Sequence, residues 1–429
     1  MKFNDRIYGP IELPPLAQEL AESCPVLLRL REVRMANIPF ASYPSFANVS
    51  RFEHSLGVAH LAWRFAQSQR LPEDEALALV LAGLYHDGAS PAFGHLYEEM
   101  LVEGGFDHEL ALVELLTGTS ELHGRADAQI FLGRRCRLQV KLPLAEAGTP
   151  LSCQGISQIL AGKHPLSPAI VGSVDLDNVD NVLRAASAMG IVAEGLVHPY
   201  EVLADLAIED GKVRRADNGG GGIARWQDVR RRLYEEILGN TFDFRAQTAI
   251  KWAISEAAKC EPELSEPASW TLTEPQLVFD HLRQHTASRR LVDSVRLGSP
   301  PDAMLVLRVR DISSLLAPGA GQRMQTLCER VEGLVGYPVF CNFYKDKAER
   351  VVTLPGVDES DSSASTPSSH CPGVVGLFRG WRDDESYSRQ RNGPQRADKD
   401  ALHSVVVQQL SLDPVPKQPQ SAQQLTIAA

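Results

Sequence analysis

The sequence has no excess of positive charge. It carries 43 lysine and arginine residues against 54 aspartate and glutamate residues, which gives a formal net charge of −11. Broad binding to nucleic acid needs a basic surface, so the composition argues against nucleic acid as a general partner. It does not exclude a small anionic substrate, because a bound metal ion can reverse the charge locally.

Cysteine pairs and long apolar runs are also lacking. The seven cysteines lie at least 13 residues apart, so the sequence has no CxxC zinc knuckle or redox pair. Scattered cysteines are typical of a reducing compartment. No run approaches the roughly 20 apolar residues of a membrane-spanning helix, and residues 1–6 lack the apolar segment of a secretory signal. We therefore expect a soluble cytoplasmic protein without a membrane partner.

Helical patterns dominate the first part of the chain. At 429 residues the chain is long enough for about two to four domains. Apolar residues recur at helical spacing at 25–34, 52–66, 72–86, 168–189, 226–238 and 247–258. Residues 76–85 are almost wholly apolar, which predicts a helix buried on all sides. We expect a mainly α protein with one helical domain over residues 1–260.

The rest of the chain has a different composition. Strand patterns at 304–309 and 351–354 flank a predicted helix near 321–334, which indicates a smaller α+β lobe over residues 261–355. Residues 356–429 are rich in Ser, Asp, Gln and Pro and show little periodicity. We therefore predict a largely disordered tail there.

Four residues have the chemistry of a metal site, namely His54, His86, Asp87 and Asp177. Imidazole nitrogens and carboxylate oxygens suit Mn, Fe, Zn or Mg better than a soft metal. Asp87 follows the apolar run at 76–85, where a carboxylate is costly unless it is paired or coordinated. Spacing alone does not decide the matter, because a His-Asp dipeptide is common and acidic residues along a helix most often form a solvated face.

The flanking residues make the pattern specific. Arg-Phe-Glu-His-Ser-Leu-Gly-Val at 51–58, Leu-Tyr-His-Asp at 84–87 and Pro-Ala-Phe-Gly-His at 91–95 resemble the HD superfamily of metal-dependent phosphohydrolases. Phe-Asn-Asp-Arg-Ile-Tyr-Gly-Pro at 3–10 and Val-Asp-Leu-Asp-Asn-Val-Asp at 174–180 resemble its deoxynucleoside triphosphate triphosphohydrolase branch. The likeness follows the order of that branch along the predicted helical domain.

This resemblance implies an all-helical HD core with a divalent metal ion. The ion would be Mn, Fe, Mg or Zn, and its ligands would be His54, His86, Asp87 and Asp177. The resemblance also implies that a metal-activated water attacks a phosphorus atom. Members of the branch often self-associate, so a homo-oligomer is implied as well.

The same resemblance gives roles to residues outside the metal site. Five residues match positions that act on the substrate: His108 as general acid or base, Glu98 as the carboxylate that orients it, His95 as a phosphate contact, Arg51 as a nucleotide contact and Tyr234 as a substrate contact. For His95 and His108 the alternative is an ordinary surface or core histidine.

Other positions depart from that branch. Ser90 stands where a second phosphate-contacting histidine is usual, and Asn181 where a tyrosine stacks on the sugar; both remain candidate substrate contacts. The other replacements are Met35-Ala36 for a Gln-Leu pair that checks the sugar, Asn178 for a lysine, Trp226 for an arginine and Ala185 for an aspartate. Losing a lysine and an arginine weakens the site for a triphosphate, since charge-assisted contacts contribute about 1.5–3 kcal/mol each.

Three functions stay open on this pattern. The first is hydrolysis of a deoxynucleoside triphosphate to deoxynucleoside and triphosphate. The second is hydrolysis of a nucleoside monophosphate or another phosphate ester, which the replacements favour. The third is a nucleotide- or nucleic-acid-binding regulator without catalysis, against which the retained His108 and Glu98 argue.

His281 and His285 form a second metal-like pattern. Their i,i+4 spacing places both on one face of a helix, where they could bind zinc. No third ligand is evident near them in the sequence, so we expect an exposed helix face instead.

Overall fold

The computed structural model describes the chain except for residues 1, 37–41, 104, 119–136, 143–148, 173, 192–196, 210–211, 217–219, 318, 348–370, 381–398 and 413–429. The described residues fall into two compact units, residues 2–300 and residues 301–412. The first unit thus extends beyond residue 260, where the sequence pattern changes. Among the described helices, none has both the length and the apolar character needed to cross a membrane.

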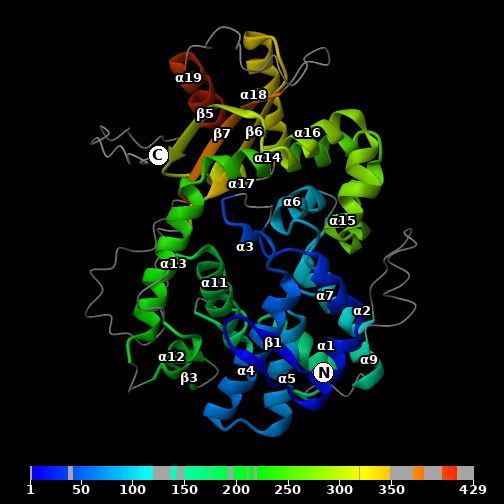
Figure 1. The fold of residues 1–429 in the computed structure, drawn as a ribbon, viewed down its shortest axis with the longest axis vertical. Coiled ribbons are helices and arrows are strands. Elements are labelled where there is room, and N and C mark those ends of the chain that lie inside the picture. The colour runs from blue at the N-terminus through cyan, green and yellow to red at the C-terminus, as the bar shows by residue number, and fades with distance from the viewer. Residues whose placement is uncertain are drawn as a thin grey trace. The chain divides into compact units, whose positions relative to one another are not determined.

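Helices make up most of the first unit (Figure 1). Among its described residues the α-helices are α1 Pro15–Ser23, α2 Pro25–Arg29, α3 Pro44–Ala47, α4 Arg51–Gln69, α5 Glu73–Tyr85, α6 His95–Glu103, α7 His108–Thr117, α9 Arg137–Lys141, α10 Cys153–Leu160, α11 Leu176–Met189, α12 Pro199–Ala204, α13 Gly222–Gly239, α14 Thr241–Ala258, α15 Glu274–Gln276 and α16 Thr286–Arg296. Shorter 3-10 turns are η1 Leu30–Glu32, η2 Ser167–Ala169, η3 Pro262–Ser265, η4 Pro267–Thr271 and η6 Leu282–Gln284, while η5 Leu277–His281 is a π-helical turn. The prediction of a mainly α protein is confirmed.

Two short antiparallel hairpins accompany these helices. Strand β1 (Phe3–Asp5) pairs with β2 (Gly9–Ile11), and β3 (Leu206–Glu209) pairs with β4 (Lys212–Arg215). The first hairpin packs against α4. It therefore brings the N-terminal residues to the helix that carries His54.

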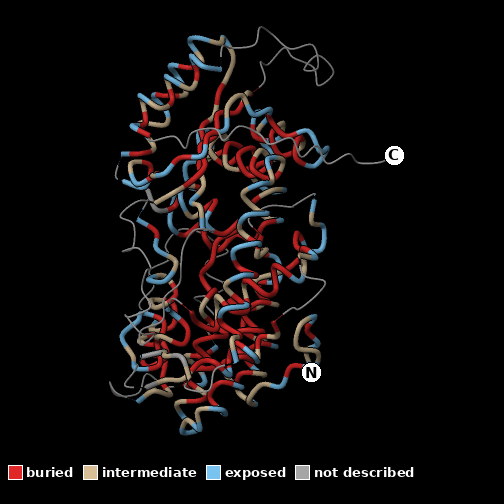
Figure 2. Tube along the Cα trace, turned by 90° about the vertical axis from the view of Figure 1, so that its left-hand side faces the viewer, coloured by how far each residue is buried: buried red, intermediate tan, exposed pale blue. Residues whose placement is uncertain are grey.

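Helices α4 and α5 form the centre of the first unit. They pack against each other more extensively than any other two elements of the chain that the structure describes. Nearly every residue of α5 from Ala76 to Tyr85 is buried, as the apolar run predicts. Helix α4 begins after Ser50, whose hydroxyl accepts a hydrogen bond from the amide of Glu53. Figure 2 shows the buried positions running through the interior of this unit.

Helix α11 begins later than the sequence predicts. Ser167 and Pro168 begin only the 3-10 turn η2. Helix α11 starts at Leu176, after Asp175, whose carboxylate accepts a hydrogen bond from the backbone amide of Asn178. Gly172 lies between the two, at a position where a Cβ atom would lie 2.6 Å from the carbonyl oxygen of Pro168. The predicted end is confirmed: Gly190 follows Met189 with φ of +69°.

A buried carboxylate ties the last part of the first unit to earlier segments. Glu274, the first residue of α15, is buried and accepts hydrogen bonds from the backbone amides of Arg34, at 2.8 Å, and Phe93. Helix α16 packs along α14 in the same part of the unit. These contacts explain why residues 261–300 belong to the first unit rather than to the smaller lobe.

The second unit is a small α+β lobe. Its sheet has the antiparallel order β5 (Asp302–Val309), β7 (Gly373–Arg379), β6 (Val339–Lys345). Its helices are α17 Ser313–Leu316, α18 Ala320–Val335 and α19 Lys399–Leu410. The predicted strand at 304–309 and helix near 321–334 are confirmed, while the predicted strand at 351–354 lies outside the described residues.

The central strand β7 and helix α19 come from the range in which composition predicts a largely disordered tail. The strand has the run Val-Val-Gly-Leu-Phe at 374–378, and its residues are buried. Both β5 and β6 pair with it along their lengths. The apolar run is short and is surrounded by polar sequence, so an averaged composition conceals it.

Leu377→Ala should destabilise the second unit by about 2–5 kcal/mol, the usual effect of removing a buried leucine side chain. Leu377 is 1% exposed and belongs to the apolar core of this unit. Urea unfolding would measure the loss, with Val306→Ala as the control because Val306 is 38% exposed. Equal stabilities for the two variants would contradict the placement of β7.

Glu274 should make stability depend on pH. Burial raises its pKa to about 7, so folding favours the protonated form. Its contribution is greatest below the unfolded pKa of about 4.3 and is lost as the pH rises through 7. Between pH 5 and pH 8 the wild-type chain should lose about 2–3 kcal/mol of unfolding free energy relative to Glu274→Gln.

Urea unfolding at both pH values measures this difference. Glu263→Gln, which changes an exposed carboxylate in η3, is the matched control and should keep the wild-type pH dependence. Parallel pH dependences for the wild type and Glu274→Gln would show that Glu274 is ionised throughout.

Candidate metal centre

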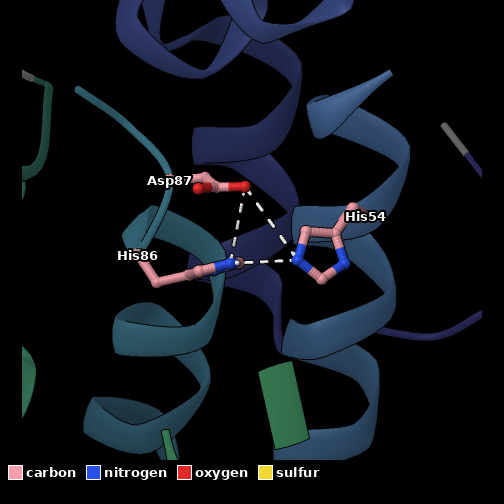
Figure 3. Close-up of side chains that lie close together, drawn as sticks. All are labelled: His54, His86 and Asp87. Atoms are coloured by element: carbon pink, nitrogen blue, oxygen red, sulfur yellow. Dashed lines mark hydrogen bonds and ion pairs between the residues drawn. The ribbon is translucent and has the colours of Figure 1, made fainter. Parts of the chain in front are cut away.

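Three helices bring the four predicted metal ligands together. His54 lies in the first turn of α4, His86 and Asp87 directly follow α5, and Asp177 lies in the first turn of α11. The Nε2 atoms of His54 and His86 are 3.2 Å apart. Figure 3 shows these two rings with Asp87 beside them, and one ligand atom from each of the three lies within 4.8 Å of the others.

Asp177 completes the group from the opposite helix. Its Oδ1 atom lies 2.8 Å from Nε2 of His54 and 3.5 Å from Nε2 of His86. Its side chain is more exposed than those of the two histidines. All four residues that the sequence proposed as ligands therefore meet at the junction of α4, α5 and α11.

Both imidazoles are oriented by a partner on the Nδ1 side. Nδ1 of His54 is bonded to Asp180 at 2.7 Å, and Nδ1 of His86 donates to the carbonyl oxygen of Gly83 at 2.8 Å. Each ring thus directs Nε2 toward the common point. Metal-binding histidines are usually held in this way, with the second nitrogen donating to a carboxylate or carbonyl.

Asp87 directs one carboxylate oxygen at the two imidazoles, with Oδ2 3.6 Å from Nε2 of His86 and 3.9 Å from Nε2 of His54. Its Oδ1 atom accepts hydrogen bonds from Arg51 at 2.6 Å and from Ser90 at 2.8 Å. Its Oδ2 atom is buried and has no hydrogen-bond partner among the described residues. A buried charged oxygen is costly unless it is coordinated or bonded. The donor set of two imidazole nitrogens and carboxylate oxygens therefore fits a divalent metal ion.

The carboxylates favour positive charge at this point. Burial alone lowers the pKa of His54, but hydrogen bonds to Asp177 and Asp180 outweigh burial and raise it to about 10. Burial alone raises the pKa of Asp87, but Arg51 and the two imidazoles hold it well below its usual range. A metal ion must displace the imidazole proton, so its affinity would fall as the pH falls.

A second cluster joins the three residues predicted to serve catalysis. Glu98 on α6 binds His95 through Nδ1 at 2.6 Å and His108 on α7 through Nδ1. Burial lowers the pKa of His108, but the hydrogen bond to Glu98 and its charge raise it above the usual value. Because Glu98 is hydrogen-bonded to Nδ1 of both rings, Nε2 is the ring nitrogen that His95 and His108 keep for another contact.

Arg51 connects the two clusters electrostatically. Burial would lower its pKa, but the charges of Asp87, Asp177 and Glu98 raise it. The Arg51 guanidinium is already bonded to Asp87. It therefore holds the carboxylate of a predicted metal ligand in place, in addition to its own predicted role as a nucleotide contact.

The predicted substrate contacts differ in their surroundings. Ser90 is buried and donates its hydroxyl to Asp87. Asn181 lies one turn after Asp177 on α11 and is half-buried. Tyr234 lies on α13, with the guanidinium of Arg230 4.9 Å from its ring centre. Helices α11 and α13 pack together, so Asn181 and Tyr234 come from neighbouring elements.

Two of the residues that replace expected phosphate contacts, Asn178 and Trp226, are engaged elsewhere or buried. The amide nitrogen of the Asn178 side chain donates to both carboxylate oxygens of Asp175, at 3.0 and 3.1 Å. Trp226 is completely buried. Neither side chain replaces the positive charge of the lysine or arginine expected there.

Sequence reasoning missed Arg29, which supports the loop after the predicted ligands His86 and Asp87. The Arg29 side chain is buried, although the sequence places it beside the apolar face of its helix. Its guanidinium donates to the carbonyl oxygens of Gly88 and Ser90, and to those of Trp270 and Leu272. No sequence signal indicates these partners, because two of them lie more than 240 residues away.

The prediction of an exposed face at His281 and His285 is wrong. Their side chains are only 18% and 24% exposed, and both bind the carboxylate of Glu261, at 2.6 and 2.5 Å. Glu261 precedes η3 by one residue and is therefore too distant in sequence to be recognised as a partner. The cluster joins the end of α14 to η5 and η6.

Comparisons with known proteins agree with the geometry. Residues 51–147 match the HD domain family. The deoxynucleoside triphosphate triphosphohydrolase SAMHD1 of Danio rerio is 28% identical over 218 residues, which cover 44% of this chain and 34% of that protein. The SAMHD1 homolog of Dictyostelium discoideum is 30% identical over 208 residues, which cover 44% of this chain and 36% of that protein.

Two uncharacterised proteins are similar over a larger part of the chain. One from Methanocaldococcus jannaschii is 35% identical over 256 residues, 59% of this chain and 49% of that protein. A hypothetical protein from Aquifex aeolicus shares the fold, with a TM-score of 0.61 and 18% identity over 95% of this chain and 99% of that one. The chain matches only about a third of the length of the two triphosphohydrolases. The match to the HD domain family thus lies over residues 51–147, and the chain is similar to deoxynucleoside triphosphate triphosphohydrolases over less than half of its length.

Proposed function

We propose that the protein is a metal-dependent phosphohydrolase that acts on a nucleotide. The observation that carries the proposal is the convergence of two imidazole Nε2 atoms on the buried Oδ2 atom of Asp87, which has no hydrogen-bond partner among the described residues. The HD domain match supports it. The first candidate substrate is a deoxynucleoside triphosphate, because the named activity of the triphosphohydrolase relatives is its hydrolysis.

A divalent ion held by His54, His86, Asp87 and Asp177 would polarise a phosphoryl oxygen and lower the pKa of a bound water. Hydrolysis adds this water to phosphorus, breaks the ester bond and leaves an oxygen that needs a proton. The raised pKa of His108 keeps its imidazole protonated to higher pH. We assign His108 Nε2 as the proton donor to that oxygen, with Glu98 holding the ring.

A smaller phosphate ester is the second candidate substrate. Ser90 uses its hydroxyl on Asp87, Asn178 uses its amide on Asp175, and Trp226 is buried. None of the three supplies the cationic contact that a triphosphate chain favours. A nucleoside monophosphate needs fewer such contacts, so this observation favours it.

Asp87→Asn should reduce turnover by more than about 100-fold, since changes to residues that only support metal ligands already cost about 10–100-fold. The protein would be loaded in turn with Mn, Fe, Mg or Zn and incubated with deoxynucleotides, ribonucleotides and monophosphates. Chromatography would identify the products. Asp74→Asn removes an exposed carboxylate at the start of α5 and serves as the matched control.

The products distinguish the candidates. Deoxynucleoside plus triphosphate would support the first substrate, and orthophosphate from a monophosphate would support the second. If the wild-type protein turned over no substrate with any metal, the hydrolase proposal would be wrong. The regulator without catalysis would then be the function to test by nucleotide binding.

Glu98→Gln should lower kcat by about 10²–10⁴-fold, the usual contribution of a positioned acid or base. Removing this carboxylate lowers the pKa of His108, because Glu98 is what raises it. The alkaline limb of the kcat profile should therefore move to lower pH. His108→Gln should lose that limb altogether, and an unchanged limb in both variants would exclude His108 as the donor.

A further inference from the structure

A network of buried charges lies behind His54, on the Nδ1 side of its ring. Asp180 and Arg184, one turn apart on α11, are both 0% exposed. Arg184 donates to Oδ2 of Asp180 through Nε at 2.8 Å and to Oδ1 through Nη2 at 2.9 Å. Oδ2 is also the atom that holds Nδ1 of His54. The two-point bond to Arg184 therefore fixes the plane of the carboxylate that orients the ring.

The network continues into the N-terminal hairpin. Nη1 of Arg184 donates to Oδ2 of Asp5 at 2.7 Å, and the hydroxyl of Tyr8 donates to Oδ1 of Asp180 at 2.7 Å. Oδ1 of Asp5 accepts hydrogen bonds from the backbone amides of Ile7 and Tyr8, at 2.7 and 3.2 Å. The turn between β1 and β2 is thus bonded both to Asp180 and to the arginine that holds Asp180.

Helix α4 leaves space for this network at Gly57. A Cβ atom there would lie 2.2 Å from Oδ1 of Asp180 and 2.3 Å from Nη2 of Arg184. His54 precedes Gly57 by three residues on the same helix. The glycine therefore allows the charged pair to approach the helix close enough to reach His54.

The four hydrogen bonds to Asp180 account for both of its oxygens. Oδ2 is bonded to His54 and Arg184, while Oδ1 accepts from Tyr8 and Arg184. A carboxylate held in this way has little freedom to rotate. It specifies which nitrogen of His54 carries the proton, and so leaves Nε2 as the atom that can bind a metal ion.

We propose that Asp180 is a positioning residue for the metal ligand His54, and that the hairpin Phe3–Ile11 supports divalent-metal affinity by holding Asp180 through Tyr8 and Asp5. The inference rests on the metal centre of the proposed function. It adds that residues near the N-terminus, about 50 positions before the ligand in the sequence, help to determine how tightly the centre binds its ion.

The test is the affinity of the full chain for Mn²⁺ alone, measured by equilibrium dialysis. Asp180→Asn should weaken it by about 10–100-fold, the usual effect of losing a partner behind a ligand. Tyr8→Phe removes one hydroxyl and should weaken it by about 2–10-fold, a smaller part of the same range. The visible spectrum of bound Co²⁺ should change in Asp180→Asn, because the ring of His54 is no longer held.

Tyr200→Phe is the matched control for the hairpin variant. Tyr200 stacks near Tyr8, with ring centres 6.1 Å apart, but its hydroxyl is bonded to Nε2 of His60. The Tyr200→Phe substitution also removes one tyrosine hydroxyl from this aromatic cluster, and it should leave the Mn²⁺ affinity at the wild-type value. Urea unfolding of all variants shows whether they fold. If Asp180→Asn does not fold, the Mn²⁺ affinity of Tyr8→Phe alone tests the proposal.

Each outcome bears on the proposal. If Tyr8→Phe and a folded Asp180→Asn bind Mn²⁺ as tightly as the wild type, the positioning role is wrong. Equal weakening by Tyr8→Phe and Tyr200→Phe would also overturn it, because the effect would then be general to the aromatic cluster. If the wild type binds neither Mn²⁺ nor Co²⁺, both proposals are wrong. Normal metal binding without any turnover would reject the proposed function alone.

Discussion

The imidazole of His54 lies between two carboxylates, and the arrangement of the site depends on it. Asp180 binds Nδ1 and Asp177 approaches Nε2, at 2.7 and 2.8 Å. Carboxylates in a buried site repel each other unless positive charge stays near them. Apolar packing brings α4, α5 and α11 together. The ring of His54 links α4 to α11, because each of its two nitrogens has a carboxylate partner on α11.

The sequence predicts the helices well and names residues that the structure brings together, but it does not predict the side chains that support them. Helix α5 is predictable because its residues are apolar all round, and His86 and Asp87 follow directly from the motif at its end. The distant partners of Arg29 and Arg184, such as Leu272 and Asp5, are not predictable, since they lie 243 and 179 residues away and depend on how elements pack. Strand β7 was concealed for a different reason, because its apolar run is short and stands among polar residues.

The hydrogen bonds of Ser90 and Asn178 give a structural role to two residues that replace phosphate contacts of the triphosphohydrolase branch. Ser90 stands where the branch has a histidine, and its hydroxyl donates a hydrogen bond to Oδ1 of Asp87. Asn178 is similarly part of the cap of α11, where it binds Asp175. Both side chains thus hold a carboxylate at or next to the candidate metal centre, and neither adds positive charge there.

Charge balance gives a separate reason for a divalent ion. Among the described residues, five carboxylates and three guanidinium groups form the bonded network around the two imidazoles: Asp5, Glu53, Asp87, Asp177, Asp180, Arg6, Arg51 and Arg184. Two negative charges are therefore uncompensated within this network. Protons on the imidazoles offset that charge, which is why the carboxylates raise both imidazole pKa values. A divalent cation would offset it equally and would leave both Nε2 atoms deprotonated, as metal ligands must be.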